Sequence, residues 1–210
     1  MISAVLPYSA FGDKLPILIN SGTIDQYVID APAIVSILNS VLFDFLARQK
    51  VTSANIDFFL VEQLPTLRRK DFEREFGLKR ARQIVKDHVL RLTYTAWDME
   101  PFARDMGYAG DPFRWDEEER RHLRARLDAL YFHLYGITDE ADIRYILSTF
   151  PIVERKDRAA HGGVYLTAEL IIWYFRALNA GDPNSLAPEA ALIRQAQRAP
   201  KRVAPLHSGE

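Results

Sequence analysis

The chain of 210 residues carries 27 Lys and Arg against 28 Asp and Glu, so its formal net charge is -1. With 48% hydrophobic residues it can bury a substantial core, and its composition is that of a soluble globular protein. The absence of cysteine excludes disulfides and thiolate metal ligands, and makes a reducing cytoplasm the expected compartment. No membrane span is expected, because the longest apolar helical run, 34–47, is shorter than the roughly 20 residues that a span requires.

The first 67 residues are expected to form a small segment of strands and helix. Asp30-Ala31-Pro32 supplies a helix start, and apolar side chains follow at helical spacing, so one helix is predicted over 31–49. Short apolar runs beside turn-forming residues predict strands on both sides of that helix. The predicted strands are residues 4–6, 15–19 and 58–61.

Residues 68–180 are predicted to be mainly helical, because apolar side chains recur there at helical spacing. The expected helix limits are residue 79 to a kink or end at Pro101, Asp116 to Gly136, Thr138 to Pro151, and Thr167 to Gly181. Residues 181–210 are rich in Ala, Pro and polar residues and are predicted to be a disordered tail. The expected fold class is therefore α+β, with a small strand-and-helix segment over 1–67 followed by a mainly helical half.

Positive charge is concentrated in residues 68–91, which carry 9 basic and 4 acidic side chains, whereas residues 1–67 carry 3 and 6. Phosphate binding requires several closely placed cations, so this basic group is the strongest indication of nucleic-acid binding. A solvated helix face with acidic neighbours explains the same pattern equally well. A second polar cluster follows the predicted helix 31–49, where helix-dipole complementarity and loop solvation are the alternative explanations. The predicted DNA contacts are Arg48, Lys50, Asn55, Arg68, Arg69, Lys70, Arg80, Arg82 and Lys86.

No catalytic, cofactor-binding or metal-binding residue is predicted. The glycines are scattered, and the Asn-Pro-Pro-Tyr or Asp-Pro-Pro-Tyr loop of adenine methylation is absent. The histidines are too widely spaced for a familiar metal-ligand pattern; His122 and His133 would lie about 16 Å apart on one helix. Glu154-Arg155-Lys156 resembles the Glu-x-Lys half of a metal-dependent nuclease motif, but no partner aspartate accompanies it, and a surface loop of mixed charge is the favoured alternative.

The order of several motifs resembles the C-terminal region of adenine-specific DNA methyltransferases. ILNS at 37–40, FDF at 43–45, RQKV at 48–51 and FFLVEQLP at 58–65 resemble the specificity region of TaqI-type enzymes. LTYTAWD at 92–98, PFARD at 101–105, PFRW at 112–115, LYG at 134–136 and YILSTFPIV at 145–153 resemble the end of large phage-defence methylases, including the DISARM type. The resemblance covers about residues 1–179.

The resemblance implies a target-recognition segment that follows a Rossmann-like domain, which binds S-adenosylmethionine and flips adenine. This sequence lacks that domain. S-adenosylmethionine is therefore expected to bind only to the missing catalytic domain, and no catalytic residue of the family can be assigned to this chain. The expected function is the DNA-binding portion of an adenine-specific methyltransferase in a restriction-modification or phage-defence system, with duplex DNA as its partner. The alternatives are a structural subunit that docks on a separately encoded methylase or helicase and, less favoured, a metal-dependent nuclease.

Overall fold

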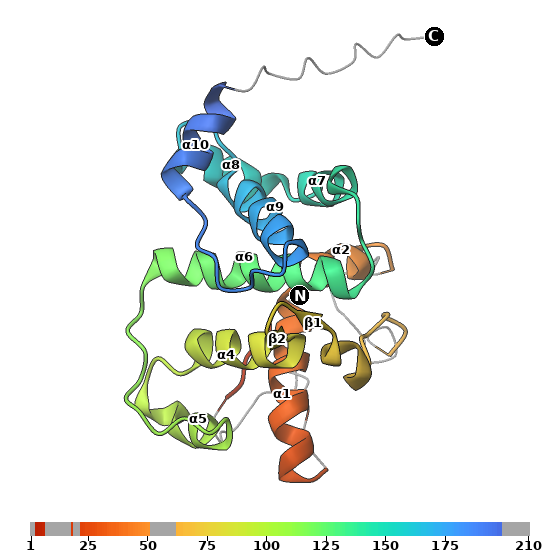
Figure 1. The fold of residues 1–210 in the computed structure, drawn as a ribbon, viewed down its shortest axis with the longest axis vertical. Helices are drawn as coiled ribbons and strands as arrows, with labels where there is room; N and C mark the ends of the chain where they lie inside the picture. The colour runs from red at the N-terminus through yellow and green to blue at the C-terminus, as the bar shows by residue number, and fades with distance from the viewer. Residues whose placement is uncertain (1–2, 7–17, 19–21, 51–61, 199–210) are drawn as a thin grey trace.

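The computed structural model describes residues 3–6, 18, 22–50 and 62–198. As the sequence predicts, the protein is α+β and mainly helical, with one small antiparallel sheet (Figure 1). The first elements are α1 (Ile24–Asn39), α2 (Val41–Arg48), the 3-10 helix η1 (Arg69–Glu73), β1 (Glu75–Phe76), β2 (Lys79–Arg80) and α4 (Ala81–Thr93). They are followed by the 3-10 helix η2 (Trp97–Met99), α5 (Glu100–Asp105), α6 (Glu117–Leu134), α7 (Glu140–Ser148), α8 (Pro151–Ala160), α9 (Leu166–Asn179) and α10 (Glu189–Arg198).

Helix α6 crosses the middle of the molecule, with α7 to α10 on one side and α1, α4 and α5 on the other (Figure 1). Its most extensive packing is against α9, and α4 packs against its other side. The apolar side chains buried at these contacts form one core, to which Phe43, Ile84, Leu130 and Ile171 belong. Residues from both the expected segments, 1–67 and 68–180, contribute to that core.

The predicted helix 31–49 is wrong in its start and in its continuity. Helix α1 begins seven residues earlier, after Thr23, which forms a capping box with Gln26, and Pro32 lies inside the helix. The helix then breaks at Ser40, whose hydroxyl accepts a hydrogen bond from the backbone of Phe43 and caps α2. Because Asp128 accepts the backbone N–H of Val41 at 2.8 Å, a contact with α6 stabilises this break.

The strand predicted at residues 4–6 is absent, and the preceding residue, Ser3, is held by hydrogen bonds between its backbone and the side chain of Asn39 in α1. Of the other predicted strands, 15–19 lies outside the described residues except for Leu18, and 58–61 lies outside them entirely. In the part of the chain that the structure describes, the strands are β1 and β2, joined by a tight turn that needs glycine. Gly77 has a φ of +59°, and a Cβ there would lie 2.1 Å from the carbonyl oxygen of Gly181.

The helix predicted from residue 79 ends earlier than expected, at Thr93. Tyr94, whose side chain is buried, lies just beyond the end of the helix. Its backbone carbonyl accepts the N–H of Phe113 at 2.9 Å. Pro101 then lies in the first turn of α5, where the missing N–H costs no hydrogen bond, so it does not kink a longer helix. The next predicted helix is confirmed, since Asp116 caps α6 and Gly136 has a φ of +81° just after it.

Two further predicted helix limits are wrong. Asp139, and not Thr138, caps α7, and Pro151 begins α8 where it was expected to end a helix. The tail predicted to be disordered from residue 181 contains α10, and Leu192 and Ile193 on that helix pack against the core. Arg126 binds the Ser185 carbonyl at 2.6 Å, so contacts with α6 hold the segment before α10. Residues 199–210 lie outside the described part of the chain.

Within the described ranges, no single helix is both long and apolar enough to cross a membrane. The pair α1 and α2 reaches the required length and composition only together, and it is bent by 61°.

Candidate functional site

A carboxylate of the 3-10 helix η1 lies between two arginines at the start of α4. One Glu73 oxygen is 3.0 Å from Arg80 Nη1, and the other is 2.9 Å from Arg82 Nη1. A second carboxylate, that of Glu75, approaches Arg80 Nε at 3.7 Å. These side chains are between 39% and 69% exposed, so the cluster lies at the surface.

Two lysines flank this cluster. Lys70 precedes Glu73 by one turn of η1, and residues three apart in a 3-10 helix lie on the same side. Lys86 follows Arg82 by one turn of α4, and residues four apart in an α-helix are neighbours. Neither lysine has an ion-pair partner among the described residues. We call Lys70, Arg80, Arg82 and Lys86, with Glu73 and Glu75, the basic patch; its four cations and two carboxylates leave a formal charge of +2.

Buried aromatic side chains hold the basic patch on the core. Phe72 in η1 and Phe76 in β1 are each only 3% exposed. Arg74 lies over the Phe76 ring and donates to the backbone carbonyl of His133 at 2.7 Å, which attaches the hairpin to the end of α6. The backbone N–H of Ala81 binds the carbonyl of Arg74, so the hairpin leads directly into α4. The patch therefore lies on a fixed scaffold.

Arg68 and Arg69, also predicted DNA contacts, are engaged elsewhere. Arg69 makes two hydrogen bonds to the carboxylate of Asp30 in α1, at 2.8 and 2.5 Å, and hydrogen bonding to Asp30 raises the pKa of the Arg69 guanidinium. Arg68 Nε lies 3.7 Å from Asp71. Both arginines border η1 and, like Arg80 and Arg82, already have acidic partners, so neither adds an unengaged cation to the basic patch.

The second predicted cluster is not brought to the basic patch by any described contact. Arg48 pairs with Asp44 at 2.8 Å and lies over the ring of Phe150, so it belongs to the junction of α2 with α7 and α8. Lys50 is exposed just beyond α2, and Asn55 lies outside the described residues. Of the nine predicted contacts, the structure thus brings Arg80 and Arg82 together through Glu73, and helical spacing places Lys70 and Lys86 beside them.

The Glu-x-Lys string lies on a helix and not in the predicted surface loop. Glu154 is on α8, where its carboxylate is 2.7 Å from Arg158 one turn later. In the part of the chain that the structure describes, the only group of three side chains placed to share a metal ion is Glu118, His122 and Glu189, which does not include Glu154. A nuclease site at Glu154 therefore gains no support.

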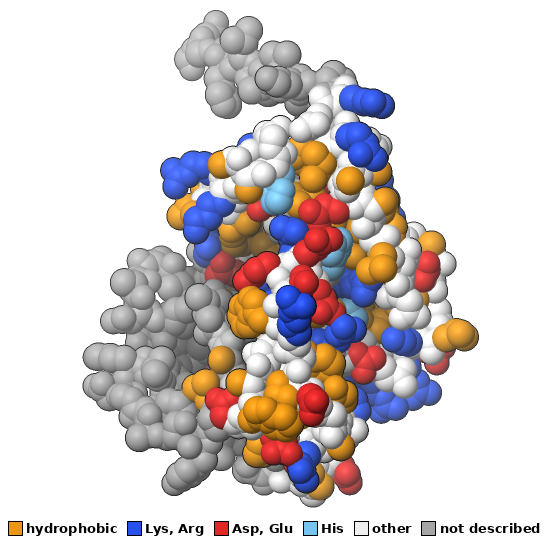
Figure 2. Space-filling model, turned by 90° about the vertical axis from the view of Figure 1, so that its left-hand side faces the viewer, with side chains coloured by type: hydrophobic (Ala, Val, Ile, Leu, Met, Phe, Trp, Pro, Cys, Tyr) orange, Lys and Arg blue, Asp and Glu red, His pale blue; other side chains and the backbone are white. Residues whose placement is uncertain are grey.

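Acidic side chains accompany the basic ones over much of the molecule. On the face drawn in Figure 2, Lys and Arg side chains are intermingled with Asp and Glu around the middle of the molecule. The acidic residues near the basic group are evident in the sequence, but the role of Glu73 is not. Its contact with Arg80 and Arg82 depends on the hairpin, and no local pattern signals it.

Comparisons with known proteins give no match: no family model, no curated protein and no solved structure is found to be similar to this chain.

Proposed function

We propose that the chain binds duplex DNA through the basic patch, as the target-recognition portion of an adenine-specific DNA methyltransferase of a restriction-modification or phage-defence system. The observation that carries duplex binding is that two lysines with no ion-pair partner among the described residues, Lys70 and Lys86, lie beside two arginines that share Glu73. The order of motifs along the sequence supports the methyltransferase context. Methyl transfer is assigned to a catalytic domain outside these residues.

The electrostatics of the patch suit a phosphate backbone. Unpaired lysines can displace the counterions that duplex DNA holds, and each phosphate neutralised in this way favours binding at low salt. The ion pairs of Arg80 and Arg82 with Glu73 are partly exposed, and pairs of that kind contribute only about 0–1 kcal/mol. Exchanging Glu73 for a phosphate therefore costs little, and both arginines are available to a duplex.

The test is a fluorescence anisotropy titration of a labelled duplex with the full chain at low salt. The double variant K70Q/K86Q removes the two unpaired cations of the patch and is expected to weaken binding by about tenfold, at roughly 0.7 kcal/mol for each lysine. The control R155Q/K156Q removes two exposed cations of α8, which have no ion-pair partner among the described residues, and is expected to bind like the unmodified chain. Equal weakening by the two double variants would mean that net charge alone governs binding and that the patch is not the contact surface.

One observation favours the second candidate function, docking on a separately encoded methylase or helicase. Helix α8 buries none of its side chains, and Ile152 and Val153 are 61% and 40% exposed. Contiguous exposed apolar surface is typical of protein contact sites, and these two side chains are neighbours on α8. Sedimentation of the chain with such a partner, alone and as the I152S/V153S variant, tests this function: loss of the complex in the variant supports docking through α8, and an unchanged complex rejects it.

A further inference from the structure

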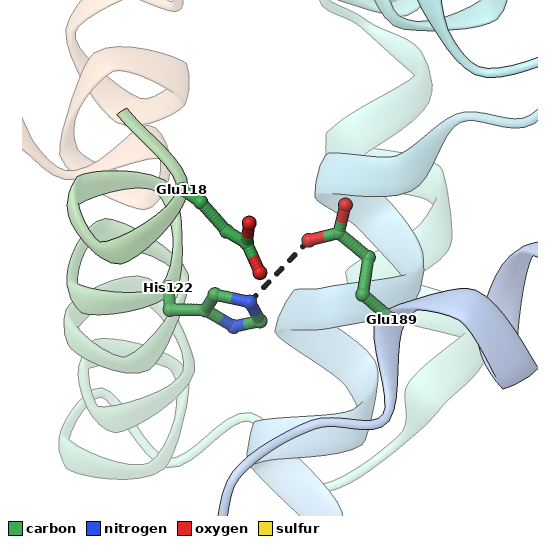
Figure 3. Close-up of side chains that lie close together, drawn as sticks. All are labelled: Glu118, His122 and Glu189. Carbon is green, nitrogen blue, oxygen red and sulfur yellow. Dashed lines mark ion pairs between the residues drawn. The ribbon is translucent and has the colours of Figure 1, made fainter. Parts of the chain in front are cut away.

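Helix α10 places a glutamate close to a glutamate and a histidine of α6. Glu118 and His122 are four residues apart on α6 and so lie on the same face of that helix. Glu189 is the first residue of α10, and its carboxylate points toward them across the gap between the helices (Figure 3). The candidate ligand atoms of the three side chains all lie within 4.8 Å of one another.

The spacing suits coordination of a single ion. Two atoms that each bind one tetrahedral zinc ion at 2.0–2.2 Å lie roughly 3.4 Å apart. His122 Nε2 and Glu189 Oε2 are 3.3 Å apart, so these two ligands already have the required separation. Glu118 is exposed, and its side chain can close the remaining distance by changing rotamer.

A second observation concerns the Glu189 oxygen that faces the imidazole. Glu189 Oε2 is buried but accepts no hydrogen bond from any described residue, although His122 Nε2 is close to it. The other oxygen, Oε1, lies 3.4 Å from Arg121 Nη2. A buried carboxylate oxygen without a donor is costly unless a cation or water satisfies it.

The surroundings of His122 fix the direction of its ring. His122 Nδ1 is 2.7 Å from the hydroxyl of Tyr174 in α9, which leaves Nε2 directed at Glu189. A hydrogen bond to the second ring nitrogen is the usual way in which proteins orient a metal-binding histidine.

We propose that Glu118, His122 and Glu189 bind a divalent transition-metal ion, with zinc as the best chemical fit, and that the ion fastens α10 to α6. Imidazole and carboxylate are established zinc ligands, and three of them leave one coordination position for water. Two of the ligands come from α6 and one from α10, so the bound ion stabilises the docked position of the C-terminal helix. The inference is independent of duplex binding.

Zinc titration of the full chain by isothermal calorimetry tests the site. We expect one zinc ion per chain, with affinity reduced at least tenfold in the Glu118→Gln variant. Glu117→Gln is the matched control, because Glu117 is the exposed neighbour on the same turn and is not one of the three ligands. Zinc binding that is equally strong in both variants, as binding at other histidines would give, overturns the proposal, and so does the absence of binding.

Hydrogen exchange tests the fastening of α10. Zinc is expected to slow amide exchange in residues 189–198 of the unmodified chain and of E117Q, but not of E118Q, because only an intact site joins the two helices. If zinc binds but leaves exchange in these residues unchanged, the ion does not hold α10. The Tyr174→Phe variant adds a second test, since loss of the hydroxyl that orients His122 is expected to weaken zinc binding by about tenfold.

Discussion

The Arg82 guanidinium lies 2.9 Å from the Glu73 carboxylate, across the junction of η1, the β1–β2 hairpin and α4. Because the same carboxylate also contacts Arg80, one acidic side chain occupies two of the four cations in the basic patch. Glu73 thus competes for the positions that duplex phosphates would take, and its removal should strengthen duplex binding.

We therefore predict that Glu73→Gln increases duplex affinity by about three- to tenfold, because it removes one negative charge and frees two arginines. The measurement is a duplex titration at fixed low salt. Glu140→Gln is the control, since Glu140 also pairs with an exposed arginine, Arg176, but lies on α7. An E73Q affinity equal to or below that of E140Q would exclude the patch as the phosphate-binding surface.

A second prediction concerns the polar contact that joins α1 to α6 inside the core. The Tyr131 hydroxyl lies 2.5 Å from Ser36 Oγ, which also donates to the carbonyl of Pro32. Tyr131→Phe leaves Ser36 bonded to that carbonyl and should lower the free energy of unfolding by about 1 kcal/mol. Ser36→Ala leaves a fully buried Tyr131 hydroxyl without a partner and should cost about 2 kcal/mol. Urea denaturation measures both losses in free energy of unfolding. A larger loss for Tyr131→Phe than for Ser36→Ala would show that the tyrosine hydroxyl finds another partner when the serine is removed.

The third prediction is a pH dependence of stability that arises from His88. Burial lowers the pKa of His88 to about 3, and the positive charge of Arg126 contributes to this shift. In the unfolded chain this pKa is about 6.5, so the unfolded state takes up a proton as the pH falls below that value. The free energy of unfolding is therefore unaffected by the titration of His88 above pH 6.5 and decreases as the pH falls toward 3. The decrease between pH 7 and pH 5 is about 2 kcal/mol.

The His88→Leu variant isolates this contribution, because the only polar contact of the buried imidazole among the described residues is with the backbone of Ile84, too poorly aligned to be a full hydrogen bond. Urea denaturation at pH 7 and at pH 5 should show that the unmodified chain loses about 2 kcal/mol more than the variant over this interval. Other groups titrate in both proteins, so only the difference between them is informative. Equal losses would mean that His88 is protonated within the folded protein.

Helices with clear local signals could be predicted from the sequence. The capping aspartate and the terminal glycine of α6 are such signals, and they gave limits close to those observed. The break at Ser40 could not be predicted in this way, because it is stabilised by Asp128, 87 residues away from Val41. Helix α10 was missed for a similar reason: contacts with α6 and α9 hold it and the segment before it, whereas its composition suggested disorder.

The two candidate sites could likewise be predicted only in part from the sequence. The basic group was evident as a local excess of charge, but the selection of Lys70, Arg80, Arg82 and Lys86 from it required the hairpin that places Glu73. The spacing of Glu118 and His122 is visible in the sequence. Their third partner, Glu189, is not, since it lies in the segment that was predicted to be disordered.

The salt dependence of duplex affinity tests most directly whether the basic patch binds phosphates. If Lys70 and Lys86 each neutralise one phosphate, a plot of log affinity against log salt concentration for K70Q/K86Q will be shallower than that of the unmodified chain by about 1.8. The R155Q/K156Q control should keep the slope of the unmodified chain. A K70Q/K86Q slope that equals that of the unmodified chain would contradict phosphate binding by the patch.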